Sequence, residues 1–81
     1  MLDLTKKNIV TGLKQTARAL REDRALCVYI AGDAEVKVTA DVLALCREKN
    51  VATVDVPSMK ELGKICGIEV AAAMAAEVSS N

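Results

Sequence analysis

Hydrophobic residues change their spacing several times along the chain, and the first regular pattern begins just after Gly12. The apolar positions there follow the i, i+4 and i+7 spacing of one helical face: Leu13, Ala17 and Leu20. A second set repeats this spacing one residue later and is cationic: Lys14, Arg18 and Arg21. The pattern predicts a helix from Gly12 to about Asp23 that packs through one stripe and exposes the other.

Runs of apolar or β-branched residues predict strands on both sides of this basic helix. The run Leu26–Ala31 is apolar throughout and is bounded by charged residues and a glycine–aspartate pair, as expected of a central strand covered on both faces. Asn8–Thr11 and Val51–Val56 are predicted to be further strands. A short helical lead-in is expected over about Asp3–Lys7.

Two later segments carry helix signals. Over Val36–Lys49 the apolar residues recur at helical spacing, and Asn50 is a suitable residue to end that helix. Ser58 is the expected N-cap of the next helix, because Glu61 follows three residues later in a capping box. Gly67 is expected to end it, since glycine adopts the left-handed conformation most easily.

The last segment, Val70–Val78, permits two interpretations. Its alanine content favours a helix on propensity alone. We nevertheless predict a strand, because strands and helices alternate through the rest of the chain and one more strand completes a sheet. The chain is therefore expected to form one α/β domain over residues 1–81, a three-layer α/β/α sandwich with a mixed sheet of about four strands.

The amino-acid composition restricts how the protein can recognise a ligand. With 81 residues, 52% of them hydrophobic, the chain can build one modest core. Lys plus Arg and Asp plus Glu both number 11, so any contact with nucleic acid must depend on a local patch of charge. Tyr29 is the sole aromatic residue, which excludes recognition by stacking bases on Phe or Tyr, as RNA-recognition sheets and OB-folds do.

Cysteine spacing and the absence of histidine argue against a zinc site or a disulfide framework. We expect Cys27, Cys46 and Cys66 to act as buried apolar side chains in a reducing cytosol, with no metal or cofactor. No apolar run reaches the length of a membrane helix, and the N-terminus lacks a secretory signal. We therefore expect a cytoplasmic protein, and a monomer in view of its neutrality and short length.

No residue pattern indicates catalysis. The four glycines are scattered, so there is no Gly-rich phosphate loop, and the charged residues show no recognisable catalytic spacing. Cys66 is expected at a helix C-terminus, where the helix dipole disfavours a thiolate. The protein is predicted not to be an enzyme; a small thiol-dependent enzyme would require unusual reactivity of Cys66.

Two segments are candidates for binding, and each also has a simple structural explanation. The cationic stripe resembles the solvated face of any amphipathic helix. In the segment 61–70, Gly67 also fits a helix C-cap, and Ile68 fits the hydrophobic contact that follows a Schellman turn. If α and β elements alternate, however, the loop after the later helix and the start of the basic helix can lie on one rim of the sandwich and form one site.

Both segments resemble the signatures of a known family. Gly12–Arg18 (GLKQTAR) and Leu62–Ala73 (LGKICGIEVAAA) are similar to the two signatures of the ribosomal protein L7Ae superfamily, which binds kink-turns in RNA. The resemblance spans essentially the whole chain and is closest to the small stand-alone bacterial members. The first signature is typically Gly-x-Asn-Glu-x-x-Lys, and its positions are occupied here by Gly12, Lys14, Gln15 and Arg18.

For the basic helix, the resemblance implies entry into the widened major groove beside tandem sheared G·A pairs. Gly12, which lacks a Cβ, would let backbone amides at the positive end of the helix approach phosphates. The planar amide of Gln15 would meet the polar atoms of a non-canonical pair. Lys14 and Arg18 would offset phosphate repulsion where the strands are pinched together.

For the second segment, the resemblance implies contact with the nucleotide that is flipped out at the bend. Ile68 and Val70, in the loop that follows Gly67, would supply apolar contact, and Glu69 would supply a polar edge. Lys64 would contact a phosphate. Asp33, in the loop after the central strand, is a further polar candidate.

The resemblance implies a non-catalytic protein that recognises and stabilises kink-turns in structured RNA, in the ribosome or in another transcript. Its partner would then be RNA recognised by shape, phosphates and a few edge contacts. The alternative is a protein-interaction or regulatory module of the same fold that does not depend strongly on the kink-turn.

Overall fold

The elements of the protein alternate between strand and helix. The computed structural model describes residues 4–5 and 7–79. The elements are, in order, β1 (Ile9–Thr11), α1 (Leu13–Arg21), β2 (Ala25–Ala31), α2 (Val36–Lys49), β3 (Ala52–Val56), α3 (Met59–Ile65) and β4 (Met74–Val78). The predicted alternation is confirmed, and the last element is a strand despite its alanine content. It begins at Met74 and not at Val70, so the loop before it is longer than predicted.

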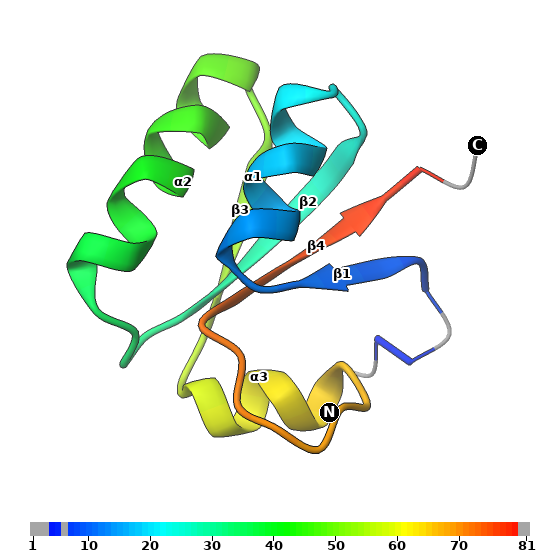
Figure 1. Ribbon diagram of the computed structural model, residues 1–81, viewed down its shortest axis with the longest axis vertical. Coiled ribbons are helices and arrows are strands. Elements are labelled where there is room, and N and C mark those ends of the chain that lie inside the picture. The colour runs from blue at the N-terminus through cyan, green and yellow to red at the C-terminus, as the bar shows by residue number, and fades with distance from the viewer. Residues whose placement is uncertain (1–3, 6, 80–81) are drawn as a thin grey trace.

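The four strands form one mixed sheet in the order β1-β4-β2-β3 (Figure 1). β2 and β3 are parallel, while β4 is antiparallel to both of its neighbours, β1 and β2. The strand β2 is therefore central, as predicted. Because β4 is inserted between β1 and β2, its first residues lie beside the ends of both of those strands.

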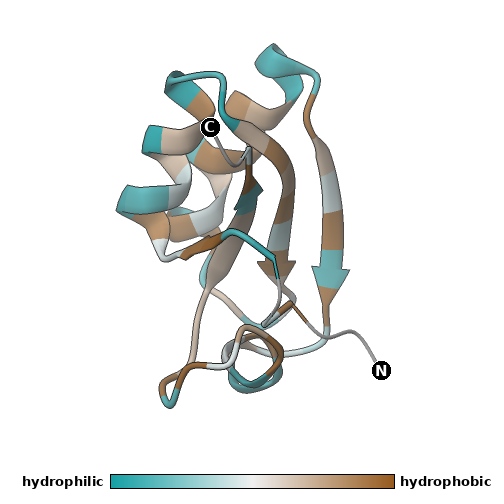
Figure 2. Cartoon of the chain, turned by 90° about the vertical axis from the view of Figure 1, so that its right-hand side faces the viewer, coloured by the Kyte–Doolittle hydropathy of each residue, from teal (hydrophilic) through white to brown (hydrophobic). Residues whose placement is uncertain are grey.

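Side chains from alternate positions of the sheet enter two separate cores. Val28, Ile30 and Met74 pack with α1 and α2, whereas Tyr29 and Ala75 pack with α3. This alternation follows from the pleat of the strands, which directs successive side chains to opposite faces. The apolar and polar alternation along β3 can be followed in Figure 2. The three-layer α/β/α arrangement is thus confirmed.

The expected helical lead-in over residues 3–7 is not a helix where the structure describes it. Leu4, Thr5 and Lys7 lie in turn and loop, and positions 3 and 6 fall outside the described residues. Leu4 is buried in the core under α3, and its N–H donates to the carbonyl of Ile65 at 2.9 Å. Burial against a distant element has overridden the local helical pattern.

Several residues are more exposed than their pattern predicted. Leu26 is 58% exposed because the β2–β4 register is irregular between Ala25 and Cys27, so it is not covered on both faces. Leu13, at the first position of α1, is 43% exposed. Cys46 is buried as expected, whereas Cys27 and Cys66 are only half-buried.

None of the helices within the described residues has the length and apolar character needed to cross a membrane.

Tyr29 provides a test of the core. Burial, together with the neighbouring Cys27 and Glu77, raises the pKa of Tyr29 from 10.0 to about 12. The unfolded chain loses its phenolic proton first as the pH rises, so this group's contribution to stability should decline from about pH 10 upward. Because Tyr29 is the sole aromatic residue, tyrosinate absorbance reports it directly. We expect a midpoint near 12 in the folded protein and near 10 in denaturant; equal midpoints would contradict burial of the phenol.

Candidate nucleic-acid interface

The junction between β1 and α1 is set by the backbone of Gly12. Its φ of 92° and ψ of 162° belong to a region that only glycine occupies readily. A Cβ at this position would meet nothing within 4 Å, so conformation, not crowding, requires glycine, and the space in front of the residue is open. The N–H of Gly12 donates to the carbonyl of Met74 at 2.9 Å, and its carbonyl accepts from Thr16 at 3.0 Å.

The first turn of α1 is suited to an anion. Among the residues that the structure describes, no side chain caps it, and no acidic residue lies in that turn. Uncapped N–H groups and the positive end of the helix dipole favour negative charge. At the start of α3, by contrast, Ser58 Oγ accepts from the N–H of Glu61 at 3.1 Å, which confirms Ser58 as the N-cap.

The predicted polar residues of α1 lie on its outer side. Lys14, Gln15 and Arg18 are exposed, while the intervening Thr16 and Ala17 are buried. Within the described part of the chain, the side chains of Lys14 and Gln15 make no hydrogen bond or ion pair. The predicted division into an exposed cationic stripe and a buried apolar stripe is therefore confirmed from Ala17 onward.

The end of α3 has the predicted turn. Gly67 has a φ of +78°, the N–H of Ile68 donates to Gly63 at 3.1 Å, and the N–H of Gly67 donates to Lys64 at 3.1 Å. These two bonds form a Schellman motif. Ile68 is half-buried and packs against the core beneath α3. Both residues thus have the structural role that the sequence allowed, whereas the adjoining Glu69 and Val70 are exposed, Val70 at 69%.

Gly63 is important to this loop and was missed by the sequence analysis. A Cβ at position 63 would overlap the carbonyl oxygen of Val70 and lie 3.3 Å from the Cα of Ala71. The loop is also held by a 3.0 Å hydrogen bond from the N–H of Ala72 to the carbonyl of Met59. A glycine inside a short helix, where it is unfavourable, was the available signal.

A hollow of about 340 Å³ lies between α3 and this loop. It is lined by Lys60, Lys64, Ile68, Glu69, Val70 and Ala71. Lys60 was not among the predicted residues, although it lies one helical turn before Lys64 on the same face. Two cations beside an apolar lining suit a ligand that combines an anionic group with a flat apolar one. A larger hollow, of about 560 Å³, lies between the end of α2 and β3 and contains none of the predicted residues.

The loop that follows the second candidate segment ends at the start of the first. The start of α1 is bonded to the start of β4 through Gly12 and Met74, and the preceding Ala73 accepts a 3.0 Å hydrogen bond from the N–H of Ala31. The loop that leaves α3 thus ends beside the start of α1 (Figure 1). The end of this loop and the start of α1 are therefore neighbours, as predicted, whereas the predicted contact residues 68–70 lie at the other end of the loop, against α3.

Asp33 has a structural partner. Its Oδ1 accepts a 2.7 Å hydrogen bond from the N–H of Met59, the first residue of α3. The carboxylate thereby ties the loop after β2 to the start of α3 and satisfies one of the free N–H groups of that helix. Asp33 therefore has a structural role, because it holds the start of α3 against the loop that follows β2.

The described residues contain no group of three or more potential metal ligands. Burial raises the pKa of the Cys66 thiol, so its thiolate fraction at neutral pH is low. The residue is thus poorly suited to act as a nucleophile.

Similarity to known sequences extends over nearly the whole chain. The sequence model of the ribosomal protein L7Ae/L30e/S12e/Gadd45 family matches residues 2–81. A Bacillus pumilus protein named "RNA-binding protein" is 47% identical over 70 residues, covering 86% of this chain and 85% of its own. The "RNA-binding protein YbxF" of Geobacillus stearothermophilus is 48% identical over 68 residues, covering 84% and 83%.

Two solved structures share the fold. A Giardia lamblia 15.5 kD RNA binding protein superposes with a TM-score of 0.84 at 24% identity, over 91% of this chain and 62% of its own. A Bacillus halodurans protein superposes with a TM-score of 0.81 at 18% identity, over 90% and 73%. The α/β architecture described above is therefore that of these larger proteins as well.

Proposed function

Since this chain belongs to the ribosomal protein L7Ae/L30e/S12e/Gadd45 family, we propose that it is a non-catalytic RNA-binding protein whose ligand is a kink-turn. It acts as a monomer in the cytoplasm, on ribosomal RNA or another structured transcript. The relatives at 47% and 48% identity, both named RNA-binding proteins, support RNA as the partner. The resemblance of the two signature segments to those of kink-turn binders supports the kink-turn.

The single observation that carries the proposal is the hydrogen bond between Gly12 and Met74. It joins the uncapped start of α1 to the end of the loop that leaves α3, so that one RNA can contact both. In a sharply bent RNA the two strands lie close together, so phosphates of both strands can contact this surface. An extended duplex lacks this bend, so fewer of its phosphates can reach both parts of the surface at once.

Recognition must depend on RNA shape and phosphates, not on stacking. Tyr29 is the sole aromatic residue and it is buried in the core. Lys14 and Arg18 supply charge to phosphates, Gln15 supplies a donor and an acceptor to base edges, and Lys64 extends the contact toward the hollow beside α3. Binding that prefers the bent RNA shifts its population from the extended form.

The proposal is tested by fluorescence energy transfer with an RNA duplex labelled at both ends. Titration into a kink-turn, without added divalent cations, should raise the transfer efficiency as the bent state becomes populated. A matched RNA that lacks the sheared G·A pairs should bind at least about tenfold more weakly, since loss of specific contacts costs roughly 1–3 kcal/mol per site.

Equal affinity for the two RNAs would remove the kink-turn from the proposal. Co-purification with a protein that survives nuclease treatment, combined with equal affinity, would favour the protein-interaction module instead.

A further inference from the structure

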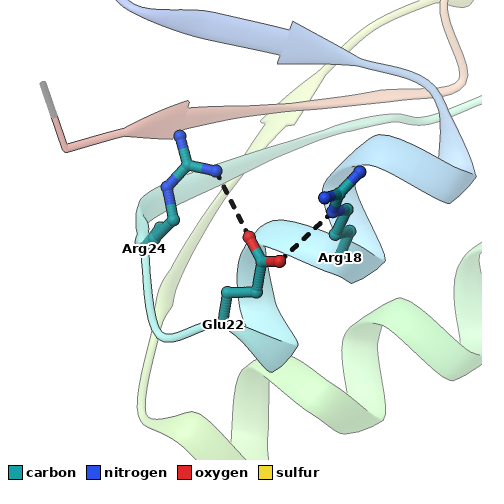
Figure 3. A network of polar contacts seen from close by, with 3 residues as sticks. All are labelled: Arg18, Glu22 and Arg24. Carbon is teal, nitrogen blue, oxygen red and sulfur yellow. Dashed lines mark hydrogen bonds and ion pairs between the residues drawn. The ribbon is translucent and has the colours of Figure 1, made fainter. Parts of the chain in front are cut away.

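Glu22 joins two arginines at the end of α1 (Figure 3). Its Oε2 accepts from Arg18 Nε at 3.2 Å, and its Oε1 accepts from Arg24 Nη1 at 3.3 Å. The three side chains remain open to solvent, with exposures of 67% for Arg18, 41% for Glu22 and 44% for Arg24. One carboxylate is thus shared between two guanidinium groups, one on each oxygen.

The backbone brings these residues together. Asp23 has a φ of 58°, which reverses the chain after α1. The N–H of Arg24 then donates to Ala19 at 2.9 Å and the N–H of Asp23 donates to Leu20 at 3.1 Å, which completes a Schellman motif. The turn that ends α1 therefore places Arg24 beside Glu22.

The pairing leaves Arg18 able to bind one further anion. A guanidinium has five N–H donors, and Glu22 occupies the one on Nε. The four donors on the two Nη atoms have no partner among residues 4–5 and 7–79, and they can form a bidentate contact with a phosphate along one direction. Hydrogen bonds from Arg18 and then Arg24 lower the pKa of the Glu22 carboxyl, so it is ionised at neutral pH.

We propose that Glu22 determines specificity by fixing the direction in which Arg18 presents its Nη groups to RNA. The inference rests on the proposed function and deepens it. A phosphate that approaches along the fixed direction binds while Arg18 remains paired with Glu22. A phosphate elsewhere must either break this pair or bind beside a carboxylate that repels it, and RNA of other shapes is therefore disfavoured.

Glu22→Gln is the first test, with affinities measured for a kink-turn RNA and for a straight duplex of equal length. We expect the affinity for the duplex to rise about three- to fivefold, the range that loss of an exposed ion pair allows. We expect the affinity for the kink-turn to stay the same or fall. The ratio of kink-turn affinity to duplex affinity therefore decreases. Glu48→Gln is the matched control, because Glu48 is exposed on the last turn of α2 and its replacement changes the net charge equally.

Glu22→Asp separates position from charge. It keeps the carboxylate but shortens the side chain by one methylene, so the carboxylate no longer reaches both arginines. The proposal requires this variant also to lower the ratio. Glu22 variants that shift both RNAs by the same factor as Glu48→Gln would overturn the inference. Wild-type protein that binds both RNAs equally would instead overturn the kink-turn proposal, and the role of Glu22 with it.

Discussion

Replacement of Gly63 by alanine should lower the free energy of unfolding by roughly 1–2 kcal/mol, as a steric cost partly offset by a gain in helix propensity. The added Cβ would overlap the carbonyl oxygen of Val70, and a clash with backbone cannot be relieved by rotating a side chain. Overpacking of this kind typically costs about 1–3 kcal/mol. Helix propensity alone predicts the opposite sign, a gain of about 1 kcal/mol for alanine over glycine. Urea unfolding followed by circular dichroism therefore decides between the two effects.

Ala44→Gly is the control for propensity. Ala44 is exposed on α2, so its replacement should cost about 1 kcal/mol through the helix backbone alone. A Gly63→Ala protein that is more stable than the wild type would show that the loop from 66 to 73 does not press on α3. The Gly63→Ala variant should also bind RNA more weakly than the wild type. The reason is that the displaced loop carries residues 68–70 and adjoins the start of α1.

Removal of both Lys14 and Arg18 should weaken binding to kink-turn RNA by roughly a hundredfold at moderate salt. Each exposed cation that contacts a phosphate contributes through the release of counterions, so the slope of log affinity against log salt should flatten by about 2. Both side chains lie on the outer side of α1, so the double alanine variant should fold normally. The measurement is a filter-binding titration at several salt concentrations.

The matched control removes one arginine and one lysine elsewhere. Arg47→Ala with Lys37→Ala changes the net charge by the same amount on α2, at two exposed positions that are not among the candidate site residues and have no ion pair within the described part of the chain. It should reduce affinity only slightly and leave most of the salt slope in place. Equal losses in the two double variants would indicate a general effect of charge and would place the RNA on another face.

The predicted elements and caps were mostly confirmed because they depend on local chemistry. The helix predicted over Val36–Lys49 has those bounds, and Asn50 ends it with a φ of 56°. Ser58 caps α3, and Gly67 follows that helix in the left-handed region. Helical periodicity, capping side chains and positive-φ residues act within a few residues of one another, so the chain order alone reveals them.

The details of the candidate site were less predictable. Gln15 and the cations of α1 were placed correctly on an exposed face, but Lys60, Gly63 and the structural bond of Asp33 were missed. Each of the three depends on a segment at least seven residues away in sequence. Spacing patterns report which face of an element is buried, and they carry no information on which loop rests against it.

The amino-acid sequence by itself determined the order of strands and helices, the mixed α/β architecture and the exposed position of Lys14 and Arg18. The tertiary structure decided how the site is assembled, because β4 is inserted between β1 and β2 and so brings Met74 to Gly12. Strand order follows from the burial of both sheet faces by the whole chain, and no local pattern encodes it. The shared carboxylate of Glu22 likewise depended on the chain reversal at Asp23.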